Sequence, residues 1–194
     1  MTPLVLASAS PRRRDLLASA GVDVVIRPAA IDENPWPDEP PLAYVRRMAR
    51  EKALAIDAGD GARVLAADTI VALDGRVLGK PGDETEACAT LRTLSGRTHR
   101  VHTAVALRHG RRVAVRVTTT RVTFRALSEA DIARYVATGE PFDKAGGYGI
   151  QGHGGALVEH IAGSYTNVVG LPLAETLARI AHMAASTGAP HGSP

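Results

Sequence analysis

Two consecutive segments of alternating side chains constrain the fold of this chain more than any other feature. The segments THRVHTAVALRHG (98–110) and RRVAVRVTTTRVTFRAL (111–127) follow one another and meet at His109-Gly110. Alternation with a period of two is typical of a β-strand, and a glycine between two such runs favours a turn. The pattern therefore predicts a long antiparallel hairpin, against which the other elements have to pack.

The rest of the chain alternates between short apolar runs and amphipathic stretches. Strands are expected at 3–8, 22–28, 62–68 and 156–163, and a hairpin turning at Asp74-Gly75 is expected over 69–79. Helices are expected at 11–21, 42–58, 83–96, 128–139 and 173–185. This order predicts an α/β fold with an elongated mixed sheet and flanking helices. Because aromatic residues make up only 4% of the chain, the core must consist mainly of Val, Leu, Ile and Ala.

The chain of 194 residues has a length typical of one globular domain. Neither an internal repeat nor a long linker divides it, so a single domain over residues 1–185 is predicted. The last residues, STGAPHGSP (186–194), are small and polar, which is typical of a flexible C-terminal tail.

Several features predict a cytoplasmic protein without membrane contact. Cys88 is the single cysteine, so no disulfide can form within the chain. The basic run at the N-terminus follows the apolar stretch, which is the reverse of a secretory signal. No apolar run approaches the roughly 20 residues that span a bilayer.

The charge balance favours a small anionic ligand over a nucleic acid. The formal net charge is +3 and the sequence pI is about 9.3, yet the basic residues are spread along the chain. No block of basic residues interleaved with aromatic ones is present, which argues against nucleic-acid binding. A basic cleft for a phosphorylated small molecule accounts for the same balance.

The first segment with chemical significance is Ser10-Pro11-Arg12-Arg13-Arg14. Ser10 is expected to cap a helix, and Pro11 to occupy its first position, where no backbone donor is needed. Arginines in the first turn oppose the positive end of the helix dipole, unless an anion binds there. Guanidinium groups and free backbone N–H groups together suit phosphate, whereas a solvated basic turn is the alternative.

Acidic side chains in two other segments are candidates for a metal site. Asp68 follows the apolar run Ala66-Ala67 and precedes Thr69, so it is expected at the end of a strand, where α/β sheets bind ligands. Glu33 lies in a Pro-rich acidic loop. Mg²⁺ usually takes one or two protein carboxylates together with substrate phosphate oxygens, and Glu33 and Asp68 could supply that pair. Asp68 could alternatively activate a water molecule; for each carboxylate, a purely structural role is the alternative.

Two lysines and a glycine-rich segment complete the set of candidates. Lys52 lies on a predicted helix, and Lys80 precedes Pro81, which fixes the direction of the turn. The segment 143–152 contains four glycines, which allow close approach of the backbone to a ligand, but it matches neither a Walker motif nor a dinucleotide fingerprint. Gln151 in this segment offers a donor and an acceptor together, as recognition of a base edge requires.

Seven segments, taken in order, resemble the Maf family of nucleotide pyrophosphatases and cover nearly the whole chain apart from its tail. They are LASASPRRRDLL (6–17), IDEN (31–34), YVRRMAREKA (44–53), AADTIVALDGRVLGKP (66–81), LSGRTHRVHTAV (94–105), YVATGEPFDKAGGYGIQG (135–152) and GSYTNVVGLPLAET (163–176).

The resemblance implies a fold similar to that of inosine triphosphate pyrophosphatases, with two lobes around a cleft. It implies hydrolysis of a nucleoside triphosphate at the α–β phosphoanhydride to the monophosphate and pyrophosphate, with Mg²⁺ or Mn²⁺. Asp68 would be the general base or a metal-linked carboxylate, and Glu33 a metal ligand. The substrate would be bound by Ser10, Arg12, Arg13, Lys52, Thr69, Lys80 and Gln151.

Within the family, the branch acting on dTTP and UTP is similar to this chain at Arg12, Thr69 and Gln151. Asn34 is a departure, since the family usually has Thr or Ser there. The resemblance also implies a homodimer. Two other functions stay open: a house-cleaning enzyme for modified nucleotides with broad base choice, and a non-enzymatic nucleotide- or nucleic-acid-binding regulator of cell division.

Overall fold

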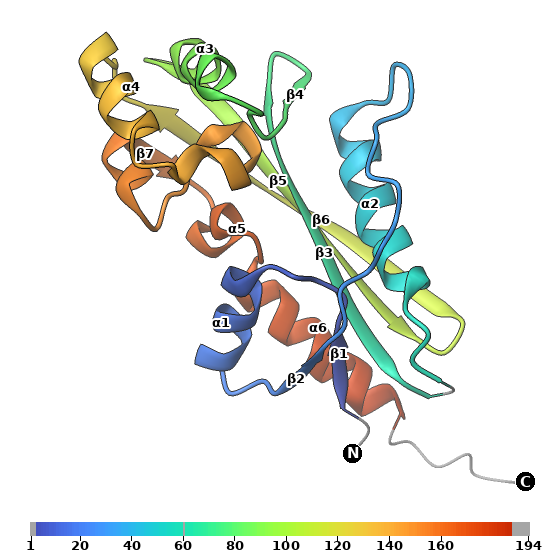
Figure 1. The fold of residues 1–194 in the computed structure, drawn as a ribbon. Helices are drawn as coiled ribbons and strands as arrows, with labels where there is room; N and C mark the ends of the chain where they lie inside the picture. The colour runs from blue at the N-terminus through green and yellow to red at the C-terminus, as the bar shows by residue number, and fades with distance from the viewer. Residues whose placement is uncertain (1–2, 60, 188–194) are drawn as a thin grey trace, which may run out of the picture.

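The fold is an α/β arrangement around one mixed sheet, as predicted (Figure 1). The structure is a computed structural model that describes residues 3–59 and 61–187. The strands are β1 (Leu4–Leu6), β2 (Val24–Ile26), β3 (Arg63–Leu73), β4 (Arg76–Leu78), β5 (Thr98–His109), β6 (Arg112–Phe124) and β7 (Val158–Ala162). Their order is β2-β1-β3-β5-β6-β7, with β4 also paired to β3. The β1 strand is parallel to both β2 and β3, and the other pairs are antiparallel.

The long hairpin predicted at the centre of the chain is confirmed. It consists of β5 and β6, which pair from Thr98 opposite Thr123 to His109 opposite Arg112. Gly110 in the turn has a φ of 54°, a left-handed conformation that glycine adopts without strain. In Figure 1 this hairpin runs diagonally through the molecule, beside β3.

Of the six α-helices in the described residues, five begin and end within three residues of the predicted positions. The α-helices are α1 (Pro11–Ser19), α2 (Pro41–Ala55), α3 (Glu84–Leu94), α4 (Glu129–Val136), α5 (Tyr165–Val169) and α6 (Leu173–Thr187). The short helix α5 was not predicted, since five residues carry no measurable period. Single-turn 3₁₀ helices occur as η1 (Glu140–Asp143), η2 (Ala145–Gly147) and η3 (His153–Leu157). The last helix includes the first two residues of the predicted tail and ends at Thr187; residues 188–194 lie outside the described part of the chain.

Three apolar clusters cover the two faces of the sheet. The first packs α2 on one face, through small residues such as Ala49 and Ala53 against Ala66 and Ala104. The second packs α3 and α4 on the upper part of the opposite face, and the third packs α1 and α6 on its lower part. These two groups are the lobes in Figure 1, with α5 between them.

The prediction of a strand end at Asp68 is wrong. Residues 63–73 form one continuous strand, and the chain turns only at Asp74-Gly75. β1 pairs with β3 up to Leu65, whereas β4 pairs with it from Val71 onward. Asp68 therefore lies in the middle of β3, where one edge of the strand has no paired neighbour among the described strands.

A buried histidine on β5 makes stability depend on pH. His99 is 1% exposed, packs edge-on against Phe124 and Tyr148, and its Nε2 lies 2.8 Å from the Tyr148 hydroxyl oxygen. Burial lowers the pKa of His99 from 6.5 to about 4. The imidazole of His99 therefore binds a proton more readily in the unfolded chain than in the folded one. We expect the neutral His99 to make its full contribution to stability above pH 6.5. As the pH falls to about 4, we expect a loss on the order of 3 kcal/mol in the free energy of unfolding.

Urea unfolding of the wild-type protein and of His99→Gln between pH 4 and 7 measures this loss. The amount by which the free energy of unfolding of the wild type exceeds that of His99→Gln should decrease steadily as the pH falls. The exposed His160 supplies a matched control, and His160→Gln should follow the wild-type curve. A difference that stays constant across this range would contradict the assignment.

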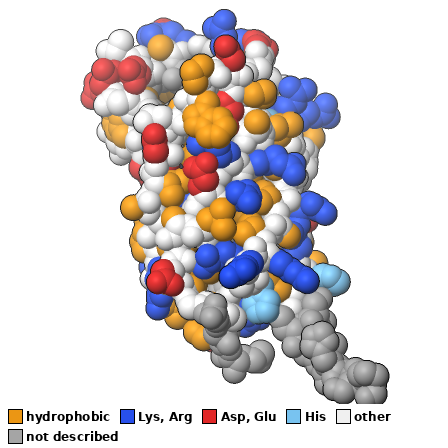
Figure 2. Space-filling view, turned by 90° about the vertical axis from the view of Figure 1, so that its right-hand side faces the viewer, with side chains coloured by type: hydrophobic (Ala, Val, Ile, Leu, Met, Phe, Trp, Pro, Cys, Tyr) orange, Lys and Arg blue, Asp and Glu red, His pale blue; other side chains and the backbone are white. Residues whose placement is uncertain are grey.

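The outer surface on the α2 side is mixed in character. Figure 2 shows Lys and Arg side chains on this face scattered among apolar and acidic ones. Within the described residues, no helix combines the length and apolar character needed to cross a membrane.

Candidate active site

A cleft of about 880 Å³ opens along the unpaired edge of β3. Its lining comes from α1, the loop before α2, α2 itself, β3, β4, β5, the segment from η1 to Gly152 and the end of α5. Its volume falls within the range of about 300–1,000 Å³ that is usual for small-molecule sites. All nine residues predicted from the sequence line it: Ser10, Arg12, Arg13, Glu33, Lys52, Asp68, Thr69, Lys80 and Gln151.

The alternation of β3 divides this cleft into two halves. Asp68 pairs with Ala104, a member of the cluster beneath α2, so its side chain lies on the α2 face. Thr69 pairs with Thr103 and lies on the opposite face. Both side chains reach the cleft because β3 has an open edge here, so a ligand can extend around the strand.

The half on the α2 face contains two carboxylates that share one ammonium group. Lys52, on the last turn of α2, is 9% exposed, and its Nζ lies 2.6 Å from Asp68 Oδ1 and 2.9 Å from Glu33 Oε1. The three side chains come from a helix, a strand and a loop, so the fold alone brings them together. The position of the Lys52 ammonium shows that both carboxylates converge on one cationic centre.

These carboxylates fit a divalent metal ion with few protein ligands. No group of three or more His, Cys, Asp or Glu side chains in ligating positions occurs within residues 3–59 and 61–187. Mg²⁺ commonly takes one or two carboxylates and completes its shell with water and phosphate oxygens. Glu33 and Asp68 match that pattern. His99 and His102 lie on opposite faces of β5, as their spacing predicts, and do not contribute.

The loop that carries Glu33 is fixed to α2. The Tyr44 hydroxyl donates to the Glu33 carbonyl at 2.7 Å, and the Arg47 guanidinium donates to the Asn34 carbonyl at 3.0 Å. Arg47 also binds Glu39 at 2.6 Å, in a pair whose side chains are 11% and 5% exposed. The Asn34 amide donates to the Asp32 carboxylate at 2.7 Å, so this departure from the family pattern serves the loop itself.

On the other face, the partly buried Arg13 is held by protein groups and is not a free phosphate ligand. It donates from Nε to the Gly170 carbonyl at 2.9 Å, from Nη1 to Ser8 Oγ at 3.0 Å and from Nη2 to Thr69 Oγ1 at 3.1 Å. Burial lowers the pKa of Arg13 from its ordinary value, against the opposing effect of Asp68. The Thr69 hydroxyl also lies 2.9 Å from Thr103 Oγ1, so protein groups already occupy much of its bonding capacity.

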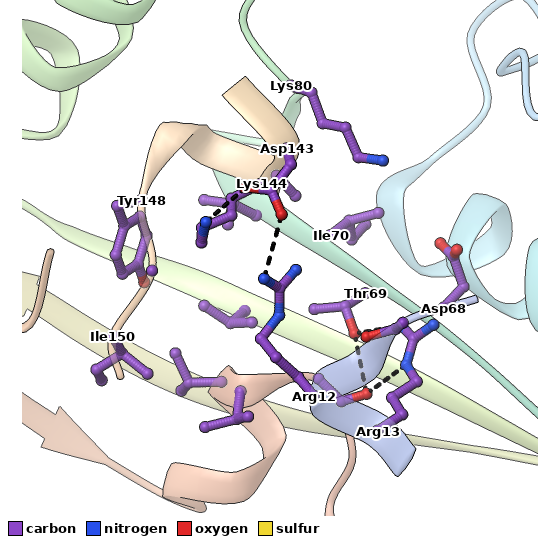
Figure 3. A pocket seen from close by; sticks show the side chains of 18 of the residues that line it. Arg12, Arg13, Asp68, Thr69, Ile70, Lys80, Asp143, Lys144, Tyr148 and Ile150 are labelled. Atoms are coloured by element: carbon purple, nitrogen blue, oxygen red, sulfur yellow. Dashed lines mark hydrogen bonds and ion pairs between the residues drawn. The ribbon is translucent and has the colours of Figure 1, made fainter. Parts of the chain in front are cut away.

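Arg12 remains available at the mouth of the cleft. It points from α1 across the cleft toward Asp143 of η1, at 3.3 Å (Figure 3). Burial acts to raise the pKa of Asp143, but the hydrogen bond and charge of Lys144, with the charge of Arg12, hold it below its ordinary value. Lys80 extends into the same space from beyond β4, and no protein partner for it is found in the described residues. Arg14 points elsewhere and pairs with Asp15.

Glycine-rich backbone and apolar side chains form the wall beside Gln151. Tyr148, Ile150, Val71 and Val101 line this wall. Gly146 has a φ of 70°, and a Cβ there would lie 2.8 Å from the Val71 side chain, so only glycine lets η2 pack on β3. The wall suits a flat, partly apolar group such as a nucleobase.

One local prediction at the start of α1 needs correction. Ser10 occupies the N-cap position and Pro11 begins the helix, but the Ser10 side chain makes no capping hydrogen bond. Its backbone N–H instead donates to Ser8 Oγ at 3.2 Å. Ser10 lines the cleft, and within the described residues its hydroxyl makes no hydrogen bond.

Sequence reasoning missed several residues of the cleft. Ser8, Tyr44, Glu140, Asp143 and Lys144 all line it. Asp143 and Lys144 flank the glycine-rich segment and could have been included on that ground. Glu140 and Tyr44 gave no local signal, because their roles depend on contacts across the fold.

Comparisons with a family model and with curated relatives point to the same protein family. The family model described as Maf-like protein matches residues 3–183. A dTTP/UTP pyrophosphatase of Myxococcus xanthus is 57% identical over 178 residues, covering 91% of this chain and 90% of the relative. One of Anaeromyxobacter dehalogenans is 56% identical over 179 residues, covering 90% and 91%, and one of Shewanella denitrificans is 53% identical over 189 residues, covering 92% and 95%.

Two solved structures were also matched. A HAM1 protein from Coxiella burnetii is 18% identical with a TM-score of 0.44, covering 64% of this chain and 73% of that one. A nucleoside-triphosphatase (dITP/XTP pyrophosphatase) from Mycobacterium abscessus is 17% identical with a TM-score of 0.43, covering 97% and 98%. The match of the family model to nearly the full length, together with relatives at over 50% identity, shows that the chain belongs to the Maf-like family.

Proposed function

We propose that this protein hydrolyses dTTP and UTP to the nucleoside monophosphate and pyrophosphate with a divalent metal ion. The observation that carries the proposal is the pair of carboxylates around Lys52 in the same cleft as Arg12, Lys80 and Gln151. The relatives described above, at 53–57% identity, are dTTP/UTP pyrophosphatases and supply the substrate class.

The triphosphate lies along the α2 half of the cleft in this proposal. Asp68 accepts a proton from a water molecule as the water oxygen forms a bond to the α-phosphorus. The bridging P–O bond between the α- and β-phosphates breaks, and pyrophosphate leaves. Lys80 and Arg12 offset the negative charge that gathers on the leaving group, since neither is tied up in a buried network.

Glu33 and Asp68 would hold Mg²⁺ or Mn²⁺, which fits their convergence on a single cationic position. Bound there, the metal would neutralise phosphate charge and polarise a phosphoryl oxygen. Lys52 already joins both carboxylates, so it keeps them in place between catalytic cycles.

The base lies on the Thr69 half of the cleft in this proposal. Gln151 offers one donor and one acceptor to the edge of uracil or thymine. Arg13 and Thr69 support this half through their contacts with Ser8 and Gly170, more than by free hydrogen bonds to the base. The apolar wall beside Gln151 accommodates the faces of the ring.

Initial rates with dTTP, UTP, CTP, ATP and GTP, each with Mg²⁺ and with Mn²⁺, test the base preference. Release of monophosphate should be at least about tenfold faster, as kcat/KM, for dTTP and UTP. Equal rates on all five would favour the house-cleaning alternative, and modified nucleotides would then be compared. Salt-sensitive binding to DNA or RNA without hydrolysis would favour the regulator instead. The homodimer and the cytoplasmic location stay predictions.

A further inference from the structure

The carboxylate of Glu140 is enclosed by the turn that carries Gln151. Its Oε1 accepts from the Tyr135 hydroxyl at 3.1 Å and from the Gly154 backbone N–H at 3.3 Å. Its Oε2 accepts from the His153 backbone N–H at 2.9 Å. Three donors from two separate segments therefore converge on the two oxygens of one side chain, which have acceptor capacity for all of them.

The turn is built to admit this carboxylate. A Cβ at Gly149 would lie 2.5 Å from Lys144 Cε and 2.7 Å from Glu140 Oε1, and a Cβ at Gly152 would collide with Glu140 Oε2. The Gly149 backbone N–H also donates to the Tyr135 hydroxyl at 3.0 Å, which closes the ring of contacts. The glycines of this segment thus provide room for Glu140, in addition to room for a ligand.

Gln151 depends on this turn for its position. Its side chain is exposed and lines the cleft, with no hydrogen bond to other groups in the described part of the chain. The direction of its amide is consequently set by the backbone on either side, between Gly149 and His153. That backbone is fixed by Glu140 and Tyr135.

We propose that Glu140 is a positioning residue for base selection, whose carboxylate fixes the 149–154 turn so that Gln151 faces the pyrimidine edge. The proposal rests on the proposed function for the nature of the base. In this proposal Glu140 acts through Gln151, since both of its oxygens accept hydrogen bonds from Tyr135 and the turn. Gln151 therefore recognises the base, and Glu140 provides the rigid backbone that this recognition needs.

Glu140→Gln isolates this role with little change in shape. A glutamine side chain presents one acceptor oxygen and one NH₂ donor in place of two acceptor oxygens, so it leaves at least one backbone donor of the turn without a partner. The turn then samples other conformations, and the amide of Gln151 is no longer held in one direction. Selectivity should fall, whereas the half of the cleft around Asp68 should be unaffected.

Binding of non-hydrolysable α,β-methylene analogues of UTP and CTP tests the proposal without relying on hydrolysis. UTP has a carbonyl at C4 where CTP has an amino group, so the ratio of the two Kd values reports on recognition of the base edge. We expect Glu140→Gln to lower the preference for the UTP analogue by about tenfold. The matched control Glu159→Gln, at an exposed position on β7, should keep the wild-type ratio.

A double-mutant cycle with Gln151→Ala distinguishes positioning from an independent effect. If Glu140 acts through Gln151, adding Glu140→Gln to Gln151→Ala should lower the ratio no further. Tyr135→Phe should shift the ratio in the same direction by a smaller factor, and it replaces Glu140→Gln if that variant does not fold. An unchanged ratio in these variants, an equal loss in both backgrounds, or a wild-type protein that binds both analogues equally would overturn the proposal. Failure of hydrolysis with an intact binding ratio would instead count against the proposed function alone.

Discussion

Replacing Asp68 by asparagine is expected to lower kcat for UTP by at least about 100-fold, the scale for losing a general base. The substitution keeps the size of the side chain but removes the group that accepts the proton of water. It also weakens the contact with Lys52 Nζ, which is 2.6 Å in the native protein. Steady-state kinetics at saturating Mg²⁺ measure the effect, and circular dichroism shows whether the fold is kept.

Asp23→Asn is a suitable control, because Asp23 is exposed in the loop before β2, away from the cleft. It should have wild-type kinetics. A folded Asp68→Asn protein with full activity would remove Asp68 from the mechanism.

Replacing Lys52 by methionine is expected to reduce kcat/KM by about 100-fold and to destabilise the protein in the absence of metal. Lys52 is buried between Glu33 and Asp68, and methionine fills the space without a charge. Loss of Lys52 leaves the buried Asp68 carboxylate without its cation, at a cost of about 3 kcal/mol in the free energy of unfolding. Because the carboxylates then lack their shared cation, Mg²⁺ should stabilise the variant more than it stabilises the wild type.

Urea unfolding with and without Mg²⁺ measures this difference directly, whether or not the variant is active. Lys80→Met provides the comparison, since Lys80 is exposed. It should raise KM while leaving stability in the absence of metal close to that of the wild type. Equal stabilisation of Lys52→Met and wild type by Mg²⁺ would show that Lys52 and the metal do not compete for the same carboxylates.

Much of the fold was predictable because local signals agree with the tertiary arrangement. The β5–β6 hairpin follows from alternation over more than twenty residues and one glycine turn. The helices α3 and α4 begin within one residue of the predicted starts, where the side chains of Asp83 and Ser128 accept capping hydrogen bonds. Such signals depend only on residues close together in the chain, so they can be recognised from the sequence alone.

The continuity of β3 was missed for the opposite reason. The pairing partners of β3 change around Asp68, since β1 pairs with β3 only up to Leu65 and β4 only from Val71 onward. The amino-acid sequence of β3 alone does not show where these partners begin and end. The predicted site residues all line one cleft, but the contacts that they make with other protein groups were not predicted. The hydrogen bond from Arg13 to Gly170 and the ion pair between Lys52 and Glu33 join segments that are far apart in the sequence.

The products formed from UTP in the presence of Mg²⁺ test the central claim most directly. Phosphorus NMR of the reaction, followed to completion, should show UMP and pyrophosphate in equal amounts, because the bond between the α- and β-phosphates is the one that breaks. UDP with orthophosphate would contradict the account, as would UTP that remains intact while the protein is folded and metal is present.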